Sequence, residues 1–132
     1  MNLFFFISIF LTVIFGVYLF DVKISTGGDD SSYIEMAHNF IRGKSFPTWH
    51  GPFYCIFLSI PMLIFGVDVV LLKAISFAFI VAQLGLFYYT FRKVVSPTLL
   101  VLIMLVVSVN STILYFASQT YSEAMYMFLQ SL

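Results

Sequence analysis

The sequence predicts an all-α, polytopic membrane protein, and its composition and apolar segments are the observations that predict this class. Hydrophobic residues make up 61% of the 132 residues and charged residues 9%, and the mean hydropathy is +1.04. Soluble domains carry about 25% charged residues. Apolar stretches of membrane-spanning length recur along the chain, separated by polar breaks. We therefore expect residues 1–132 to form a single, incomplete transmembrane domain built from helices.

The composition also argues against several functions. Six acidic and six basic residues give zero net charge, which gives no indication of nucleic-acid binding. The single cysteine, Cys55, lies in the apolar run "YCIFLSI", where a buried and unreactive thiol is expected. His38 and His50 have no partner at ligand spacing, so the sequence does not predict a histidine zinc site.

The first element is a transmembrane helix over residues 1–20. The segment "MNLFFFISIFLTVIFGVYLF" holds about 20 mainly apolar residues, enough to cross a hydrocarbon core of about 30 Å. A cleaved signal peptide is the competing interpretation. The segment lacks a basic start and a small-residue cleavage site, and its apolar run is longer than a signal peptide needs. We therefore interpret it as an uncleaved span.

Residues 21–67 are expected to form an outer loop that contains two short helices. In "DDSSYIEMAHNFIRGK", apolar residues recur at helical spacing and leave a polar opposite face. This pattern predicts an amphipathic helix over 29–42 that lies on the membrane. Asp29 suits its N-cap and Gly43 its C′ position.

The second short helix, 52–66, is expected to stay at the membrane surface or re-enter it. Gly51-Pro52 and Gly66 bound an apolar segment that contains Pro61. A segment of about 14 apolar residues fits an interfacial or re-entrant helix better than a span, and an internal proline favours a kink. Whether this helix crosses the bilayer decides on which side every later segment lies.

Two further spans follow over 68–92 and 97–116, and residues 121–132 begin a fourth. Lys73 lies near the outer end of its helix, where its side chain is expected to extend to the interface. The Arg92-Lys93 turn is expected in the cytoplasm by the positive-inside rule.

The side of the membrane on which each acidic residue lies follows from these assignments. If 52–66 does not cross, Asp29, Asp30 and Glu123 meet on the outer face. If it crosses, Glu123 falls on the inner side. The charge bias favours the first topology.

The acidic residues in these segments have two interpretations. Asp29, Asp30 and Glu123 stand at helix starts, where a carboxylate stabilises backbone N–H groups and the positive end of the helix dipole. Alternatively, they perform chemistry, because they converge on one predicted face beside Gly27-Gly28 and two half-buried helices. A carboxylate placed at the membrane–water interface can act as a general base on a substrate with a polar head and a lipid tail.

The sequence "DDSSYIEMAHNFIRGKSF…HGPFYCIFLSIPMLIFG" resembles the first outer loop of the GT-C membrane glycosyltransferases. The resemblance is closest to the protein O-mannosyltransferases and the bacterial lipid A aminoarabinose transferases. These enzymes have paired acids after a transmembrane helix, then a tyrosine and a small residue at fixed spacing, and a glycine that closes the helix. The matching positions are Asp29, Asp30, Tyr33, Ala37 and Gly43.

The similarity continues beyond this helix. The "PPL-Y" element of the family matches "HGPFY", the Phe-Gly that ends its juxtamembrane helix matches Phe65-Gly66, and its later acid matches Glu123 in "SQTYSEAMYMFL". Two positions depart from the pattern. Gly51-Pro52 replaces the usual Pro-Pro, and the arginine common after the Phe-Gly is at best Lys73.

The resemblance implies a glycosyltransferase that moves a sugar from a polyprenyl-phosphate donor to a hydroxyl acceptor at the outer membrane–water interface. Asp29 and Asp30 would be the catalytic residues, with Asp29 as the general base that takes the acceptor proton. Asp30 would also help to shape the pocket. Glu123, Tyr33 and His50 would contact substrate, with Glu123 orienting the acceptor or holding a cation.

The resemblance also bears on cofactors, partners and location. A leaving phosphate monoester needs less metal assistance than a nucleotide diphosphate, so no obligatory cofactor is expected, and a divalent cation stays open as an alternative. The expected partners are the lipid bilayer and the lipid-linked sugar, with no nucleic acid, and the oligomeric state is left open. The location implied is the cell membrane, with several spans and an extracytoplasmic active face.

Two alternatives compete with this function. Enzymes of this group continue for many more helices, whereas this chain stops within its fourth span, so we expect an N-terminal part that is inactive by itself. The first alternative is a non-catalytic multi-pass subunit or assembly factor whose acids only cap helices. The second is a transporter fragment with Glu123 and Gln83 on an ion path.

Overall fold

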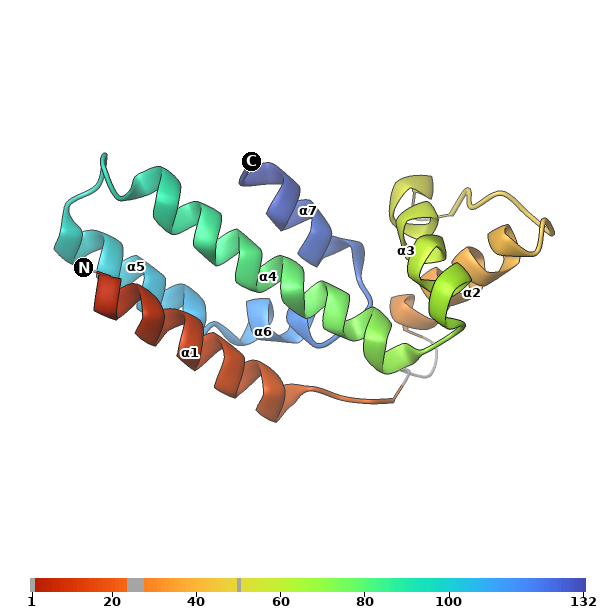
Figure 1. The fold of residues 1–132 in the computed structure, drawn as a ribbon, viewed down its shortest axis with the longest axis horizontal. Helices are drawn as coiled ribbons and strands as arrows, with labels where there is room; N and C mark the ends of the chain where they lie inside the picture. Colours follow the sequence, from red (N-terminus) through yellow and green to blue (C-terminus); the bar gives the residue numbers. More distant parts are fainter. Residues whose placement is uncertain (1, 24–27, 50) are drawn as a thin grey trace.

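The computed structural model describes residues 2–23, 28–49 and 51–132, and within them it consists of seven α-helices and no β-strand (Figure 1). The all-helical class predicted from the sequence is confirmed for these residues. In chain order the helices are α1 (Asn2–Leu19), α2 (Asp29–Ile41), α3 (Pro52–Phe65), α4 (Val69–Phe91), α5 (Pro97–Ser108), α6 (Ser111–Ala117) and α7 (Ser122–Gln130).

The helices form an elongated molecule with a bundle and a separate helix pair at one end. Helices α1, α4 and α5 pack on one another, and α7 packs along α4. The pair α2 and α3 lies beyond the N-terminal end of α4, whereas the start of α1 and the α4–α5 turn lie at the opposite end (Figure 1). The end of α1, the start of α4 and the α6–α7 connection therefore all lie toward the α2–α3 pair.

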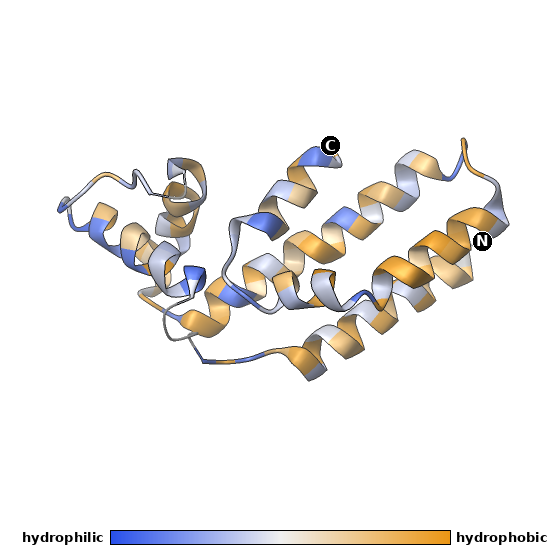
Figure 2. Cartoon of the chain, turned by 180° about the vertical axis from the view of Figure 1, so that it is seen from behind, coloured by the Kyte–Doolittle hydropathy of each residue, from blue (hydrophilic) through white to orange (hydrophobic). Residues whose placement is uncertain are grey.

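The bundle buries small polar side chains and exposes large apolar ones. Ser8 and Thr12 of α1 are fully buried together with Ser108 of α5, and the Thr12 hydroxyl lies 3.5 Å from the Ser108 carbonyl oxygen. In contrast, Phe6 and Phe10 of α1 are more than 60% exposed. Hydrophobic residues run along α1, α4 and α5 in Figure 2, and hydrophilic ones gather largely in the connections and on α2. Small polar contacts between apolar helices are typical of membrane proteins.

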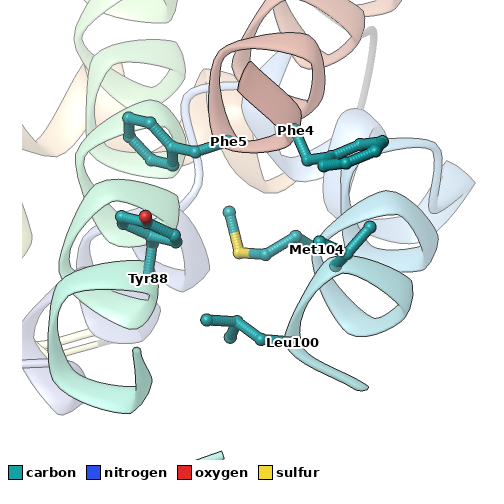
Figure 3. Close-up of a pocket in the computed structure, with 6 residues that line it drawn as sticks. Phe4, Phe5, Tyr88, Leu100 and Met104 are labelled. Atoms are coloured by element: carbon teal, nitrogen blue, oxygen red, sulfur yellow. The ribbon is translucent and has the colours of Figure 1, made fainter. Parts of the chain in front are cut away.

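An apolar junction holds the bundle together at the end remote from α2 and α3. Phe4 and Phe5 of α1 converge there with Tyr88 of α4 and with Leu100 and Met104 of α5 (Figure 3). The rings of Phe5 and Tyr88 are stacked with centroids 4.4 Å apart. The space enclosed by these side chains is too small for a water molecule, so this junction is packing rather than a ligand cavity.

Helix α4 is long and apolar enough to cross a membrane. Helices α5 and α6 meet this criterion only together, as a pair bent by 57° that forms either a broken span or a re-entrant loop. The described part of α1 and the whole of α3 are shorter apolar helices. The structure is therefore compatible with membrane association through one clear span, or two if the bent pair is counted.

The bend between α5 and α6 departs from the single helix predicted over 97–116. Asn110 has an extended backbone, and its side-chain oxygen accepts hydrogen bonds from the backbone N–H groups of Thr112 and Ile113 at 3.0 and 3.1 Å. It therefore acts as an N-cap that begins a new helix. An asparagine within an apolar run ends one helix here and starts another.

The two short helices form close to where the sequence places them. Helix α2 ends in a Schellman motif, because Gly43 has φ 66° and the N–H groups of Gly43 and Lys44 donate to the carbonyls of Phe40 and Asn39. The predicted C′ role of Gly43 is confirmed. Helix α3 begins after Gly51 and ends at Gly66, both with positive φ.

Helices α2 and α3 share a core that also reaches α4 and α7. Ala37 of α2 and Cys55 and Leu58 of α3 are fully buried in it, and Leu72 and Met125 join it from α4 and α7. The predicted burial of Cys55 is confirmed, and burial raises the pKa of its thiol, as expected for an unreactive cysteine. This shared core fixes the start of α2 against the bundle.

Candidate functional site

The acidic pair opens α2, but the two carboxylates lie in different environments. The N-cap is Gly28, with an extended backbone and no side-chain cap, so the prediction that Asp29 is the N-cap is wrong. Asp29 and Asp30 instead occupy the first turn, where the helix dipole favours negative charge. Asp29 is exposed to solvent, whereas Asp30 is fully buried. Only the first acid of the pair therefore faces outward.

Asp30 is paired with a buried lysine of α4. The Lys73 Nζ atom lies 3.8 Å from Asp30 Oδ2, and both side chains have no exposed surface. The Lys73 ammonium also donates to Gln119 Oε1 at 3.1 Å and to the Lys23 carbonyl. The ammonium therefore makes two hydrogen bonds and one ion pair, and all three partners accept rather than donate.

Lys73 does not extend to the interface as predicted from the sequence. Its side chain turns inward because the buried Asp30 carboxylate and the Gln119 amide offer partners there. Leaving a buried charge unpaired would cost several kcal/mol. The Lys73 side chain of α4 therefore connects α4 to three other segments: the start of α2, the segment after α1 and the α6–α7 connection.

The third predicted acid, Glu123, lies near Tyr33, as Asp29 does. The Tyr33 hydroxyl and Ser122 Oγ are 2.9 Å apart, and Ser122 Oγ lies 3.4 Å from Glu123 Oε2. Burial raises the pKa of Tyr33, the hydrogen bond to Ser122 opposes this, and the charges of Glu123 and Asp29 raise it further. Both carboxylates therefore influence the Tyr33 phenol. The fold brings three predicted site residues together: Asp29, Tyr33 and Glu123.

A second tyrosine, Tyr54 of α3, packs against the ring of Tyr33. The rings of Tyr33 and Tyr54 meet edge to face with centroids 5.0 Å apart. The Tyr54 hydroxyl lies 3.2 Å from the Ser76 hydroxyl of α4, and burial is the main cause that raises the Tyr54 pKa. Tyr54 is 2% exposed, so it is a core residue.

Two other predictions concern His50 and metal ions. His50 falls outside the described residues, so its predicted contact with substrate is not placed. Among the described residues, no group of three or more His, Cys, Asp or Glu side chains could hold a metal ion.

Four further residues shape the site and were not identified from the sequence as site residues. Lys73, Gln119, Thr120 and Ser122 all lie at the end of the bundle that faces α2, and Thr120 Oγ1 is buried with no hydrogen-bond partner in the described part of the chain. The polar break "ASQTYSE" was the available signal. Its position between apolar segments indicated a loop, but not that Gln119 turns inward.

The side chains of Asp29, Glu123 and Tyr33 together could support proton transfer from a hydroxyl group. Asp29 supplies an exposed carboxylate and Glu123 a half-exposed one, and the charges of both act on the Tyr33 phenol. An exposed carboxylate can take a proton from a hydroxyl group, and a neighbouring carboxylate or phenol can orient that hydroxyl.

Comparison of the chain with protein-family profiles, with characterised proteins and with solved structures gives no match.

Proposed function

We propose that this chain forms the acidic, membrane-surface part of a glycosyltransferase that uses a lipid-linked sugar. The observation that carries the proposal is the convergence of Asp29 and Glu123 on Tyr33, from segments far apart in the sequence. The resemblance of residues 29–66 to GT-C transferases supplies the reaction class. In this proposal α2 and α3 lie at the outer membrane surface.

The proposed membrane arrangement follows from the polarity of the bundle. Helices α1, α4 and the bent pair α5–α6 cross or enter the bilayer, with the Arg92-Lys93 turn in the cytoplasm. Buried serine and threonine together with exposed phenylalanine on α1 support this arrangement, because lipid favours apolar outer surfaces. The α2–α3 pair lies at the opposite end from that turn (Figure 1), so Asp29 and Glu123 then share the extracytoplasmic side.

The proposed reaction is a displacement at the anomeric carbon of the donor sugar. Asp29 takes the proton of the acceptor hydroxyl, and the acceptor oxygen forms a bond to that carbon. The bond from the carbon to the lipid phosphate breaks, and the phosphate leaves with the electron pair. Glu123 and Tyr33 orient the acceptor. Asp30 acts through its ion pair with Lys73, which positions α2 and so positions Asp29.

The experiment is a transfer assay in membranes of the source cells. The chromosomal copy is replaced by Asp29→Asn, and transfer from radiolabelled polyprenyl-phosphate sugars is measured. Loss of a general base lowers the rate by about 10²–10⁴-fold, with unchanged amounts of protein. Asp21→Asn is the matched control, because Asp21 is an exposed acid shortly before α2. Transfer that survives in the Asp29 variant, or that falls equally in the control, contradicts the proposal.

One observation favours the alternative of a non-catalytic membrane subunit. Asp30, one half of the acidic pair, is engaged in a buried ion pair, which is a structural use of a carboxylate. The same assay separates the two functions. A structural subunit predicts that Asp30→Asn lowers protein abundance and that Asp29→Asn changes nothing.

A further inference from the structure

A surface pocket on the outer side of α2 combines polar side chains with the chain's single tryptophan. It has a volume of about 270 Å³ and is lined by Ser32, Glu35, Met36, Asn39 and Trp49. Ligand sites typically combine an aromatic or apolar surface with a few polar groups. We propose that this pocket binds a pyranose ring of a carbohydrate.

The four lining residues of α2 share one face of the helix. Residues 32, 35, 36 and 39 follow the spacing of neighbours on a helix surface. They supply a hydroxyl, a carboxylate and an amide, which together donate to and accept from sugar hydroxyl groups. Met36 adds an apolar, adaptable contact.

The loop after α2 holds Trp49 beside this face. Phe46 meets Phe40 of α2 edge to face, with centroids 5.9 Å apart, and Pro47 is buried. The Phe46–Phe40 contact returns the loop to α2, and Trp49 lines the pocket while 71% of its surface stays exposed. A flat indole exposed beside hydrogen-bonding groups suits a pyranose, whose ring face carries C–H groups and whose edge carries hydroxyls.

The polar lining distinguishes this site from a membrane anchor. Aromatic residues near a membrane surface commonly anchor a protein at the interface, and Trp49 is a candidate for that role. A helix anchored in lipid presents an apolar face, whereas three of the four residues beside Trp49 are polar and Glu35 is exposed. An anchored Trp49 would bring the Glu35 carboxylate against the lipid, and none of the described residues that line the pocket is basic.

The position of the pocket indicates that it binds the acceptor of the transfer reaction. This inference about the acceptor rests on the proposed function. Ser32 follows Asp29 by three residues, which is about 4.5 Å along a helix axis, and the two lie on neighbouring positions of one face. A saccharide bound at Trp49 and extending toward the start of α2 presents a hydroxyl to Asp29. The acceptor of the transfer reaction is therefore a carbohydrate.

Intrinsic fluorescence tests the pocket directly, because Trp49 is the only tryptophan of the chain. The chain is placed in lipid nanodiscs and titrated with methyl α-D-mannopyranoside and with maltose, and sorbitol serves as an acyclic control. A saturable change in emission with the cyclic sugars is expected at millimolar concentration. Combining Glu35→Ala with Asn39→Ala removes two hydrogen-bonding groups of the pocket and should weaken binding about tenfold or more. Ser45→Ala, in the same loop, should leave binding unchanged.

A second measurement covers binding that leaves the emission unchanged. Saturation-transfer NMR on the sugar protons should show contact with the wild-type chain and lose it in Trp49→Ala. Absence of both signals, or an equal response to sorbitol, overturns the proposal. Quenching of Trp49 by brominated lipid without any sugar response identifies a membrane anchor instead.

The two proposals fail separately. Asp29→Asn should keep the sugar titration while it abolishes transfer. Transfer that depends on Asp29 without sugar binding at Trp49 overturns only the pocket. Sugar binding without any dependence of transfer on Asp29 overturns only the proposed reaction.

Discussion

The ion pair between Asp30 and Lys73 gives the sharpest stability prediction. Replacement of Lys73 by methionine keeps much of the side-chain length and removes the charge. The Asp30 carboxylate then stays fully buried without its cation, and Gln119 and the Lys23 carbonyl lose the same donor. We expect Lys73→Met to be strongly destabilising.

The magnitude follows from the distance between the charges. At the 3.8 Å between Nζ and Oδ2, Coulomb attraction amounts to about 4 kcal/mol at an effective dielectric constant of about 20. Removing one partner of a buried pair costs about 3–5 kcal/mol. Asp30→Asn should cost less, about 1–3 kcal/mol, because Lys73 keeps both of its hydrogen-bond acceptors.

The assay is equilibrium unfolding in detergent for the wild type, both single variants and the double variant. The double variant should recover a large part of the sum of the single losses, because it leaves no unpaired buried charge. Lys44→Met is the matched control, since Lys44 is exposed, and it should change the free energy of unfolding by less than about 0.5 kcal/mol. A loss for Lys73→Met no larger than that of this control refutes the buried ion pair.

Three further predictions concern the supports of the site. Gly43→Ala should cost about 1 kcal/mol in unfolding free energy because its φ of 66° disfavours a side chain, whereas Gly85→Ala, with open space around the new methyl group, should be neutral or stabilising by up to about 1 kcal/mol. Asn110→Ala removes the N-cap of α6 and should cost about 1 kcal/mol with loss of helical circular dichroism. Since the pKa of Tyr33 is raised above 10.0 in the fold, the unfolded chain binds fewer protons above that pH, and stability falls as pH rises from about 10. Tyr33→Phe should make that fall smaller, besides losing about 1 kcal/mol near neutral pH for the bond to Ser122. An unchanged alkaline slope would contradict the burial of the phenol.

Local sequence signals determined the helix boundaries well. The expected helices 29–42 and 52–66 correspond to Asp29–Ile41 and Pro52–Phe65. Gly43, Gly51 and Gly66 mark these ends because each adopts a positive φ that side chains disfavour. Such signals act within a few residues and can be read from one sequence.

Features that depend on tertiary packing could not be read in this way. Lys73 near a helix end predicts a side chain that reaches the interface, and only the fold shows that Asp30 and Gln119 meet it inside. The break at Asn110 escaped prediction because the short polar stretch Asn110–Thr112 lies inside an otherwise apolar run, as a continuous span also tolerates. The expected topology predicted that Asp29, Asp30 and Glu123 share one face, but it predicted neither their convergence on Tyr33 nor the different burial of Asp29 and Asp30.

Cysteine accessibility in intact cells tests most directly the claim that Asp29 and Glu123 serve one outer site. Single cysteines are placed at Ser32 and Ser122, beside the two carboxylates, and at Val94 in the turn at the opposite end of the bundle. Cys55→Ala is the background, because Cys55 is buried and alanine adds no polar group at this position. With a membrane-impermeant maleimide, Ser32→Cys and Ser122→Cys should react from outside, and Val94→Cys only after permeabilisation. Reaction of Ser122→Cys only after permeabilisation would place Glu123 on the opposite side from Asp29 and contradict the single-site account.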